Sequence, residues 1–374
     1  MRVLFIPGNS PATVYTHAAL ATALQNSGHQ VFVAGMDWIL KDITSLGLPA
    51  MPISSMSEDD VVAFRETMPE EPDELARVVG EVYAQIAIDG LRPLLEMSQH
   101  WPPDVVVGGT MNYGAALLAE HLGVPSVRLG WDRSHSGPYD PGAQRILQPV
   151  LHERGLETLP EPDMWIDVCP PTLRPAGTTS RQPMRYIPRN PQCRLEPWMY
   201  ARGERRRVCL TAGARVLEDG ALGNLLKTLS EADVELVLPV PETVATELHA
   251  QFDDMRAGWI PLDVLAPTCD LIVHHGGGAT DMTALHFGVP QLVVVQDVET
   301  GEMRRLAEHG AGITLYPDQQ SPEHIRAACN EILTSPSYRN KAQSIAAEMA
   351  TLPTPAEIVP QLEALASDPR KRGK

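Results

Sequence analysis

The chain has 374 residues, which is long for a single hydrophobic core and suits two domains. Its formal net charge of -17 at pH 7 argues against a nucleic acid or an anionic membrane as a partner, because either would need a basic binding surface. The five cysteines are scattered and nowhere spaced as CxxC, which indicates reduced thiols rather than a disulfide framework or a zinc site.

The start of the chain carries a short apolar run at 3–6. This run ends at Pro7 and Gly8, so it is too short for a secretory signal or a membrane span. The basic residues between 370 and 374 are interpreted as a solubilising end of the chain. We therefore expect a cytoplasmic protein.

Strand-like and helical segments alternate through the first half of the chain. Residues 1–6 are typical of a buried strand, and Ser10-Pro11 indicates a helix start, because serine is a common N-cap and proline a common first helical residue. Further strand-like runs, each after a helical segment, occur at 31–35, 104–109 and 126–129. This alternation predicts a parallel sheet with helices on both faces.

A proline-rich stretch at 159–200 interrupts this pattern and suits an ordered connector, because proline prevents long helices. The pattern then restarts with strand-like runs at 207–211, 234–238, 271–274 and 291–295. We expect two doubly wound α/β domains in series. The expected domains are 1–200, 201–350 and a C-terminal helix with a basic tail at 351–374 that packs back toward the N-terminal domain.

The ligand of such a protein is expected at the carboxyl ends of the strands, in a cleft between the two domains. The loops that follow the strands are 7–12, 109–112, 130–140, 211–216, 274–281 and 296–302. The candidate chemistry should therefore be sought in these loops.

One of these loops is rich in glycine and reads His274-His275-Gly276-Gly277-Gly278-Ala279-Thr280. A glycine turn that opens a helix presents backbone amides and the positive end of the helix dipole to one point, which suits a diphosphate. It is neither a P-loop, since no lysine follows, nor a GxGxxG dinucleotide turn. His275 could donate a hydrogen bond to phosphate or to the departing oxygen. Alternatively, either histidine fills the strand end, and His274 should point the other way.

Three segments around this turn carry a resemblance to a known family: GWIPLDVLAPTCDLIVHHGGGAT, LHFGVPQL and RRLAEHGAGI. They resemble the nucleotide-sugar half of the inverting GT-B glycosyltransferases that decorate bacterial natural products. The likeness extends over essentially the whole chain. The segments MRVLFIPGNSPATVY, GGTMNYGAALLAEHLGVP, WIDVCPPTLRP and QCRLEPWMY most resemble the actinomycete olivosyltransferases of angucycline pathways, of the landomycin and urdamycin type.

The resemblance implies a GT-B fold, in which two Rossmann-like domains face each other across a cleft. It implies a dTDP-deoxysugar donor in the C-terminal domain and a polycyclic aromatic acceptor in the N-terminal one. Carried over by position, it assigns the diphosphate to His275, Gly277, Gly278, Ala279 and Thr280. A further phosphate contact falls in the loop of Gly213 and Arg215, although Arg215 could also face solvent.

For the base and the sugar, the resemblance points to two other stretches. An indole at Trp259 would stack on the pyrimidine while backbone groups at Ile260 and Leu262 read its edge, although a lone tryptophan is more often a core residue. The loop at 296–302 lacks the Asp-Gln pair that binds the hydroxyls of fully hydroxylated sugars. Since each unpaired polar group would cost roughly 1–3 kcal/mol, this suits a 2,6-dideoxyhexose such as D-olivose. Asp297 and Glu299 are candidates for the remaining contact, or solvated carboxylates.

The position of the general base also departs from the pattern of the family. Many relatives place a histidine where this chain has Ser10, and serine is a poor base. Asp132 matches an aspartate of the urdamycin-type relative, and a carboxylate in an apolar cleft has its pKa raised toward the working range. A phenolic acceptor, with a pKa of about 10, needs less help than an alkyl hydroxyl. Alternatively, Asp132 pairs with Arg133 or caps a loop, and Ser10 is only an N-cap.

The function expected is transfer of a deoxysugar to an angucycline acceptor with inversion, at a phenolic oxygen or, alternatively, at an aromatic carbon. His275 would help to neutralise the leaving diphosphate. No metal or cofactor is expected, and the protein would be a monomer or a homodimer. Acceptor choice is assigned to a mobile loop at 51–90. The hypotheses from other classes are a nucleotide-sugar epimerase or hydrolase and a non-catalytic sugar-nucleotide binding protein.

Overall fold

The computed structural model describes residues 1–54, 57, 68–69, 71–175, 181–211, 221–230, 233–250, 255–295 and 301–368. The chain packs as two units. The first consists of Met1–Cys169, Ala176–Arg189 and Leu352–Lys374, and the second of Pro170–Pro175 and Asn190–Thr351. Within the described helices, none combines the length and the apolar composition that a bilayer crossing demands.

The first unit is built on a seven-stranded parallel sheet. Its strands are β1 (Arg2–Ile6), β2 (Gln30–Met36), β3 (Ala50–Ser54), β4 (Val105–Gly109), β5 (Ser126–Leu129), β6 (Met164–Asp167) and β7 (Gln182–Pro183). Their order is β3-β2-β1-β4-β5-β6-β7, so the chain moves outward in one direction from β1 and then returns to continue from β4. The sheet therefore has a topological switch point between β1 and β4.

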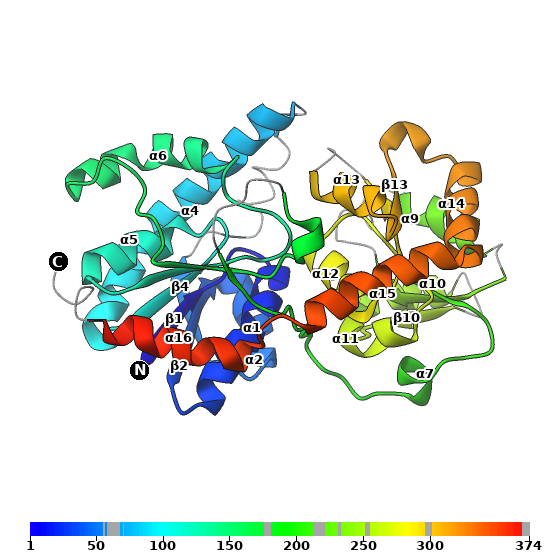
Figure 1. The fold of residues 1–374 in the computed structure, drawn as a ribbon, viewed down its shortest axis with the longest axis horizontal. Helices are drawn as coiled ribbons and strands as arrows, with labels where there is room; N and C mark the ends of the chain where they lie inside the picture. The colour runs from blue at the N-terminus through cyan, green and yellow to red at the C-terminus, as the bar shows by residue number, and fades with distance from the viewer. Residues whose placement is uncertain are drawn as a thin grey trace. The chain divides into compact units, whose positions relative to one another are not determined.

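Helices cover both faces of this sheet (Figure 1). They are α1 (Pro11–Asn26), η1 (Asp37–Ile39), α2 (Leu40–Ser45), α4 (Pro72–His100), α5 (Tyr113–Leu122), α6 (Asp140–Glu153) and α16 (Pro355–Ser367). The last of them, drawn in red, lies along α1, and His29 of the turn after α1 bonds Glu363 of α16 at 2.8 Å. The end of the chain thus completes the first unit.

The second unit repeats the design with six parallel strands in the order β10-β9-β8-β11-β12-β13. These strands are β8 (Arg207–Leu210), β9 (Glu235–Pro239), β10 (Arg256–Gly258), β11 (Leu271–His274), β12 (Gln291–Val294) and β13 (Gly312–Leu315). Here the switch point lies between β8 and β11.

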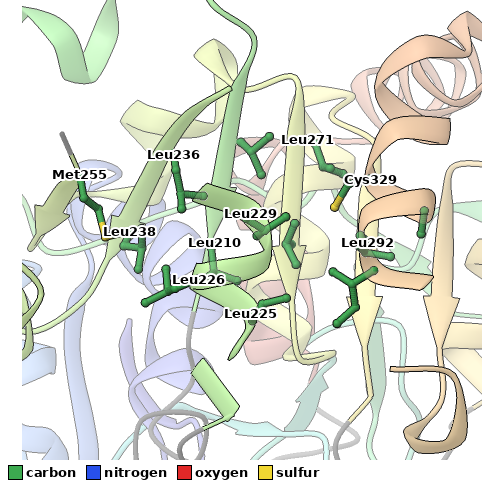
Figure 2. Close-up of a cluster of buried hydrophobic side chains, with 14 of the residues drawn as sticks. Leu210, Leu225, Leu226, Leu229, Leu236, Leu238, Met255, Leu271, Leu292 and Cys329 are labelled. Atoms are coloured by element: carbon green, nitrogen blue, oxygen red, sulfur yellow. The ribbon is translucent and has the colours of Figure 1, made fainter. Parts of the chain in front are cut away.

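The helices of the second unit also pack on both faces of its sheet. They are η2 (Pro171–Leu173), α7 (Pro197–Tyr200), α9 (Ala221–Ser230), α10 (Glu242–His249), α11 (Leu262–Leu265), η3 (Ala266–Thr268), α12 (Gly278–Phe287), α13 (Gly301–Glu308), η4 (Pro317–Gln319), α14 (Pro322–Thr334) and α15 (Pro336–Ala350). Figure 2 shows the core on one face, where Leu210 and Leu292 of the sheet meet Leu226 and Cys329 of the helices. Cys209, the neighbour of Leu210, belongs to the core on the other face.

The structure confirms the predicted two-domain α/β fold with parallel sheets. It places residues 190–200 in the second unit, ahead of the boundary expected at 200. The reason is a set of contacts with the segment after β10: Gln192 bonds Asp263 at 3.1 Å, and the indole Nε1 of Trp259 donates to the Pro191 carbonyl at 3.1 Å.

The expectation of a mobile loop over 51–90 is wrong for most of the described residues in that range. Residues 51–54 belong to β3, and α4 begins at Pro72. The acidic residues before and after Pro72 are helix-start signals, because the Glu71 side chain accepts from the Glu74 amide at 2.8 Å and Asp73 lies in the first turn. The remaining residues, 55–56, 58–67 and 70, lie outside the described part of the chain.

Candidate functional site

The switch point of the second sheet brings together two loops that the sequence singled out. Thr211 follows β8, and the glycine turn at 275–277 follows β11, the strand that pairs with β8. The Thr211 amide donates to the Val273 carbonyl at 2.9 Å, so the two loops start side by side. The Thr211 hydroxyl is buried and has no hydrogen-bond partner among the described residues. It is therefore a buried polar group at the start of the loop that follows β8.

The turn depends on two of its glycines. Gly276 has φ +99°, and a Cβ at this position would lie 2.1 Å from Cε of Met303. A Cβ at Gly277 would lie 3.0 Å from Nε2 of His275. A side chain at either position would therefore push a neighbour away, and at Gly276 it would also strain the backbone.

The amides after this turn suit an anion. The first intrahelical hydrogen bond of α12 runs from the Asp281 amide to the Gly277 carbonyl at 3.0 Å. The amides of Gly278 and Thr280 precede it and have no intrahelical partner, and both residues are only partly buried. The positive end of the helix dipole adds to them. Diphosphate oxygens are the ligands that such a helix start accepts well.

The two histidines lie in different places. His275 is partly buried and stands against Gly277, at the surface of the turn. His274 is 2% exposed, accepts from the Gly276 amide at 3.1 Å through Nδ1, and bonds Oε1 of Gln291 at 2.7 Å through Nε2. Only His275 is thus placed to contact a ligand at the turn.

The expected base-binding stretch follows β10 at the same edge of the sheet. The Trp259 side chain is 40% exposed, so its interpretation as a core residue is wrong. Ile260 and Leu262 are buried in the core with Cys209, which leaves only their main-chain groups for a base. Within the described ranges, the main-chain N–H and C=O of Ile260 make no hydrogen bond. An exposed indole face beside unpaired main-chain groups can stack on and read a pyrimidine.

Four of the expected donor-binding residues are Gly213, Arg215, Asp297 and Glu299. All four lie outside the described residues. The donor-side geometry therefore rests on the glycine turn, on Thr211 and on the stretch at 259–262.

In the first unit, Ser10 and Asp132 follow β1 and β5, the two strands that flank β4. Ser10 is the N-cap residue of α1, but its side chain makes no capping hydrogen bond. The helix start is held by its carbonyl, which accepts from the Thr13 hydroxyl at 2.7 Å. The Ser10 hydroxyl is not used by the helix, so an N-cap role does not account for it.

Asp132 belongs to a local turn. Its Oδ1 accepts from the Ser134 amide at 2.7 Å and from the Ser134 hydroxyl, and the residue is partly buried. This is the loop-capping arrangement that the sequence left open as an alternative. It engages Oδ1 and fixes the direction of the carboxylate.

The neighbouring Trp131 ties the two loops together. Its indole Nε1 donates to the Pro7 carbonyl at 2.9 Å, and its own carbonyl accepts from the Thr16 hydroxyl at 2.9 Å. His17, also on α1, is 1% exposed, and burial lowers its pKa to about 4. A neutral imidazole enclosed in this way is not placed to act as a base for a bound substrate.

A narrow, mostly apolar recess lies at the carboxyl ends of β1 to β4. It holds about 450 Å³ of space outside atoms, part of it open to solvent. Its polar members include Asn9 and Tyr83, whose hydroxyl donates to Oδ1 of Asn9 at 2.8 Å. The apolar lining includes Ile6, Met36, Ile53, Ile86, Leu94 and Met111. Neither Asn9 nor Tyr83 was singled out in the sequence, and no local signal marks the pair, because 74 residues separate them.

Comparison with known proteins identifies two domain families in this chain. The N-terminal domain of erythromycin biosynthesis protein CIII-like proteins matches residues 22–213, and their C-terminal domain matches residues 223–365. The L-demethylnoviosyl transferase of Streptomyces niveus is 34% identical over 378 residues, which cover 99% of each chain.

Two solved structures resemble the fold along almost its whole length. The spinosyn rhamnosyltransferase SpnG, complexed with thymidine diphosphate, matches with a TM-score of 0.87 and 30% identity, over 97% of this chain and 100% of that one. The glycosyltransferase SsfS6 of Streptomyces sp. SF2575, also complexed with thymidine diphosphate, matches with a TM-score of 0.85 and 33% identity, over 97% and 99%.

Proposed function

Because this chain belongs to the erythromycin biosynthesis protein CIII-like family and is a deoxysugar glycosyltransferase, we propose that it transfers a 2,6-dideoxyhexose from a dTDP-sugar to an aromatic polyketide. The observation that carries this proposal is the glycine turn at the switch point between β8 and β11, where free helix amides suit a diphosphate. Two similar glycosyltransferases, SpnG and SsfS6, have solved structures in complex with thymidine diphosphate.

The donor lies along the carboxyl edge of the second sheet in this proposal. The thymine stacks on Trp259 and is read by main-chain groups at Ile260 and Leu262. The diphosphate lies over the amides at 277–280 and contacts His275. As the bond to the sugar breaks, negative charge grows on the diphosphate, and the fixed amides and the imidazole stabilise it without having to reorganise.

The acceptor lies against the first unit. The recess that Asn9 and Tyr83 help to line offers apolar side chains to an aromatic molecule, and the Ser10 and Asp132 loops lie at the same edge of the sheet. Asp132 takes the acceptor proton, while the Ser10 hydroxyl, which the helix does not use, orients the acceptor oxygen. Attack on the face opposite the diphosphate inverts the anomeric configuration.

We propose D-olivose as the sugar, an angucycline as the acceptor and a phenolic oxygen as the point of attachment. The loop at 296–302 supports the sugar, since its sequence lacks the Asp-Gln pair that a fully hydroxylated sugar requires. The relatives support only a broader class, because their sugars and aglycones vary, as in the aclacinomycin-T 2-deoxy-L-fucose transferase of Streptomyces galilaeus.

The test incubates the protein with dTDP-olivose, with and without an angucyclinone, and identifies the products by mass spectrometry and NMR. We expect an olivosylated acceptor with an inverted anomeric centre and slow loss of donor when the acceptor is left out. Loss of donor at the same rate without acceptor would instead identify an epimerase or a hydrolase. Binding without turnover would identify a sugar-nucleotide binding protein.

The same product distinguishes the two linkages. An anomeric carbon bonded to oxygen supports O-transfer, and one bonded to an aromatic carbon supports C-transfer to the same acceptor. His275→Ala should lower turnover strongly, whereas Thr283→Val, a buried change in the second turn of α12, should not.

A further inference from the structure

A buried chain of hydrogen bonds stands behind the glycine turn. The Gly276 amide donates to Nδ1 of His274 at 3.1 Å, and the opposite ring nitrogen bonds Oε1 of Gln291 at 2.7 Å. The amide nitrogen of Gln291 then donates to the Asp281 carbonyl at 3.4 Å. The His274 and Gln291 side chains are buried, with exposures of 2% and 0%.

Both ends of this series of hydrogen bonds lie on the segment that carries the candidate diphosphate-binding amides. Gly276 is inside the turn, and Asp281 is in the first turn of α12, so the two side chains connect the beginning and the end of the stretch that carries the free amides. Gln291 is the first residue of β12 and is held in the sheet, where its main-chain N–H donates to the Ala311 carbonyl at 3.2 Å. The turn is thereby attached to the rigid part of the sheet.

We propose that His274 and Gln291 are positioning residues of the donor site, which fix the direction of the turn amides and so set the affinity for the diphosphate. This inference rests on the proposed function of the turn. Neither residue touches the donor. They act through Gly276 and through the start of α12.

The hydrogen bonds require one protonation form of His274. Nδ1 accepts from a main-chain amide, so it carries no proton, and Nε2 must carry the proton that it donates to Gln291. The orientation of Gln291 follows from its second contact, because its nitrogen donates to a carbonyl and its oxygen therefore faces the ring. A neutral imidazole with its proton on Nε2 is therefore the form of His274 that can make both of these hydrogen bonds.

Loss of this support should affect the diphosphate and spare the nucleoside. An amide that turns away from a charged oxygen loses a charge-assisted hydrogen bond, which corresponds to an affinity about tenfold weaker or more. Among the described residues, the base-binding stretch at 259–262 makes no hydrogen bond with His274 or Gln291. Thymidine should therefore bind to the variants as it binds to the wild type.

The experiment measures the Kd of dTDP and of thymidine for the full chain by titration calorimetry. Gln291→Met keeps the volume of the side chain and removes both of its hydrogen bonds. His274→Leu removes the acceptor for Gly276, whereas His274→Asn retains an acceptor oxygen near the position of Nδ1 and should rescue much of the dTDP affinity. Thr283→Val is the matched control, because it removes one buried hydrogen bond of α12, from the Thr283 hydroxyl to the Ala279 carbonyl at 2.7 Å, and leaves in place the bonds of His274 and Gln291 that hold the turn.

We expect Gln291→Met and His274→Leu to bind dTDP about tenfold more weakly, with thymidine affinity unchanged and with the control unaffected. Equal losses for dTDP and thymidine, or no loss for either variant, would overturn the inference. Long-range ¹H–¹⁵N spectra of the wild-type histidine rings give a readout that needs no variant to fold. A proton on Nδ1 of His274 would also overturn it.

The outcome for the wild type separates this inference from the proposed function. A wild-type protein that fails to bind dTDP contradicts the proposed donor site itself. A wild-type protein that binds dTDP, together with variants that bind it equally well, contradicts only the positioning role.

Discussion

Replacing Gly276 with alanine should either strain the second unit or weaken its hold on a diphosphate. The residue has φ +99°, a left-handed conformation that costs an L-residue about 1–2 kcal/mol. The added Cβ would also stand 2.1 Å from Cε of Met303, but that atom ends a flexible side chain and moves at little cost. If the turn keeps its shape, the unfolding free energy should therefore fall by about 1–2 kcal/mol.

If the turn relaxes instead, the strain disappears and the amides lose their common direction. One lost hydrogen bond to a charged oxygen costs about 1.5–3 kcal/mol, which is roughly a 10- to 150-fold increase in the Kd of dTDP. Urea unfolding measures the first quantity and titration calorimetry the second. We expect the loss of unfolding free energy and the loss of dTDP binding free energy, added together, to equal or exceed the cost of about 1–2 kcal/mol for the left-handed conformation.

Gly310→Ala provides the matched control. Gly310 lies in the same unit with φ +71°, and the nearest atom to its added Cβ is Cγ of Lys341 at 3.8 Å, so the change has a similar backbone cost far from the turn. Its Kd for dTDP should equal that of the wild type. Equal losses of affinity in both variants would refute the assignment of the diphosphate to this turn, as would wild-type affinity and stability in Gly276→Ala.

The remaining predictions concern the base, the acceptor side and the stability of the units. Trp259→Ala should weaken thymidine binding by about 1–3 kcal/mol in calorimetry, whereas Trp259→Phe retains a ring face and most of the affinity. Asp132→Asn should lower kcat about 10²- to 10⁴-fold with an unchanged Kd for dTDP, and a loss of dTDP affinity would contradict its role as the base. Glu235→Ala removes the carboxylate that lies 2.9 Å from the buried guanidinium of Arg207, so the unfolding free energy measured in urea should fall by about 3–5 kcal/mol. An unchanged value would mean that the Thr268 hydroxyl alone satisfies this guanidinium. Burial lowers the pKa of His17 from 6.5 to about 4, so the unfolded chain takes up this proton first, and the unfolding free energy should fall as the pH drops from 6.5 toward 4. This slope should be shallower in His17→Asn.

The central strands of both sheets could be predicted from the sequence, and the outer ones could not. Runs such as Val105-Val106-Val107 are apolar throughout because helices cover both faces of the sheet. β10 has three residues and β7 has two, one of them Pro183, and both lie at the edge of a sheet. Such segments are too short to display a period, and an edge strand tolerates proline.

The helix α4 shows how local signals can be misread. Its first turn contains Asp73 and Glu74, and a methionine- and acid-rich stretch precedes it, so the sequence pattern predicts a mobile loop. The buried positions of α4 are mostly small residues such as Gly80, Ala84 and Ala87, which contribute little apolar character to the pattern. Close packing against neighbouring helices, rather than a strong apolar stripe, fixes this helix.

Within the candidate site, adjacent residues were predicted and distant pairs were missed. The glycine turn, with His275 at its edge, is a continuous motif, so its position after a strand could be read directly. The bond between Tyr83 and Asn9, and the support of Gly276 by Gln291 through His274, depend on residues that meet only in the folded sheet. No spacing rule connects such residues along the chain.

The return of α16 to the first unit sets an order for synthesis on the ribosome. Helix α16 packs along α1, and the Arg185 amide donates to the Pro353 carbonyl at 2.7 Å, so residues near 353–367 complete a body that began at residue 1. The whole of Asn190–Thr351 is translated in between. The nascent first unit therefore remains unfinished until residues 353–367 have been translated, and a chain cut after Arg189 would leave α1 without the helix that packs along it.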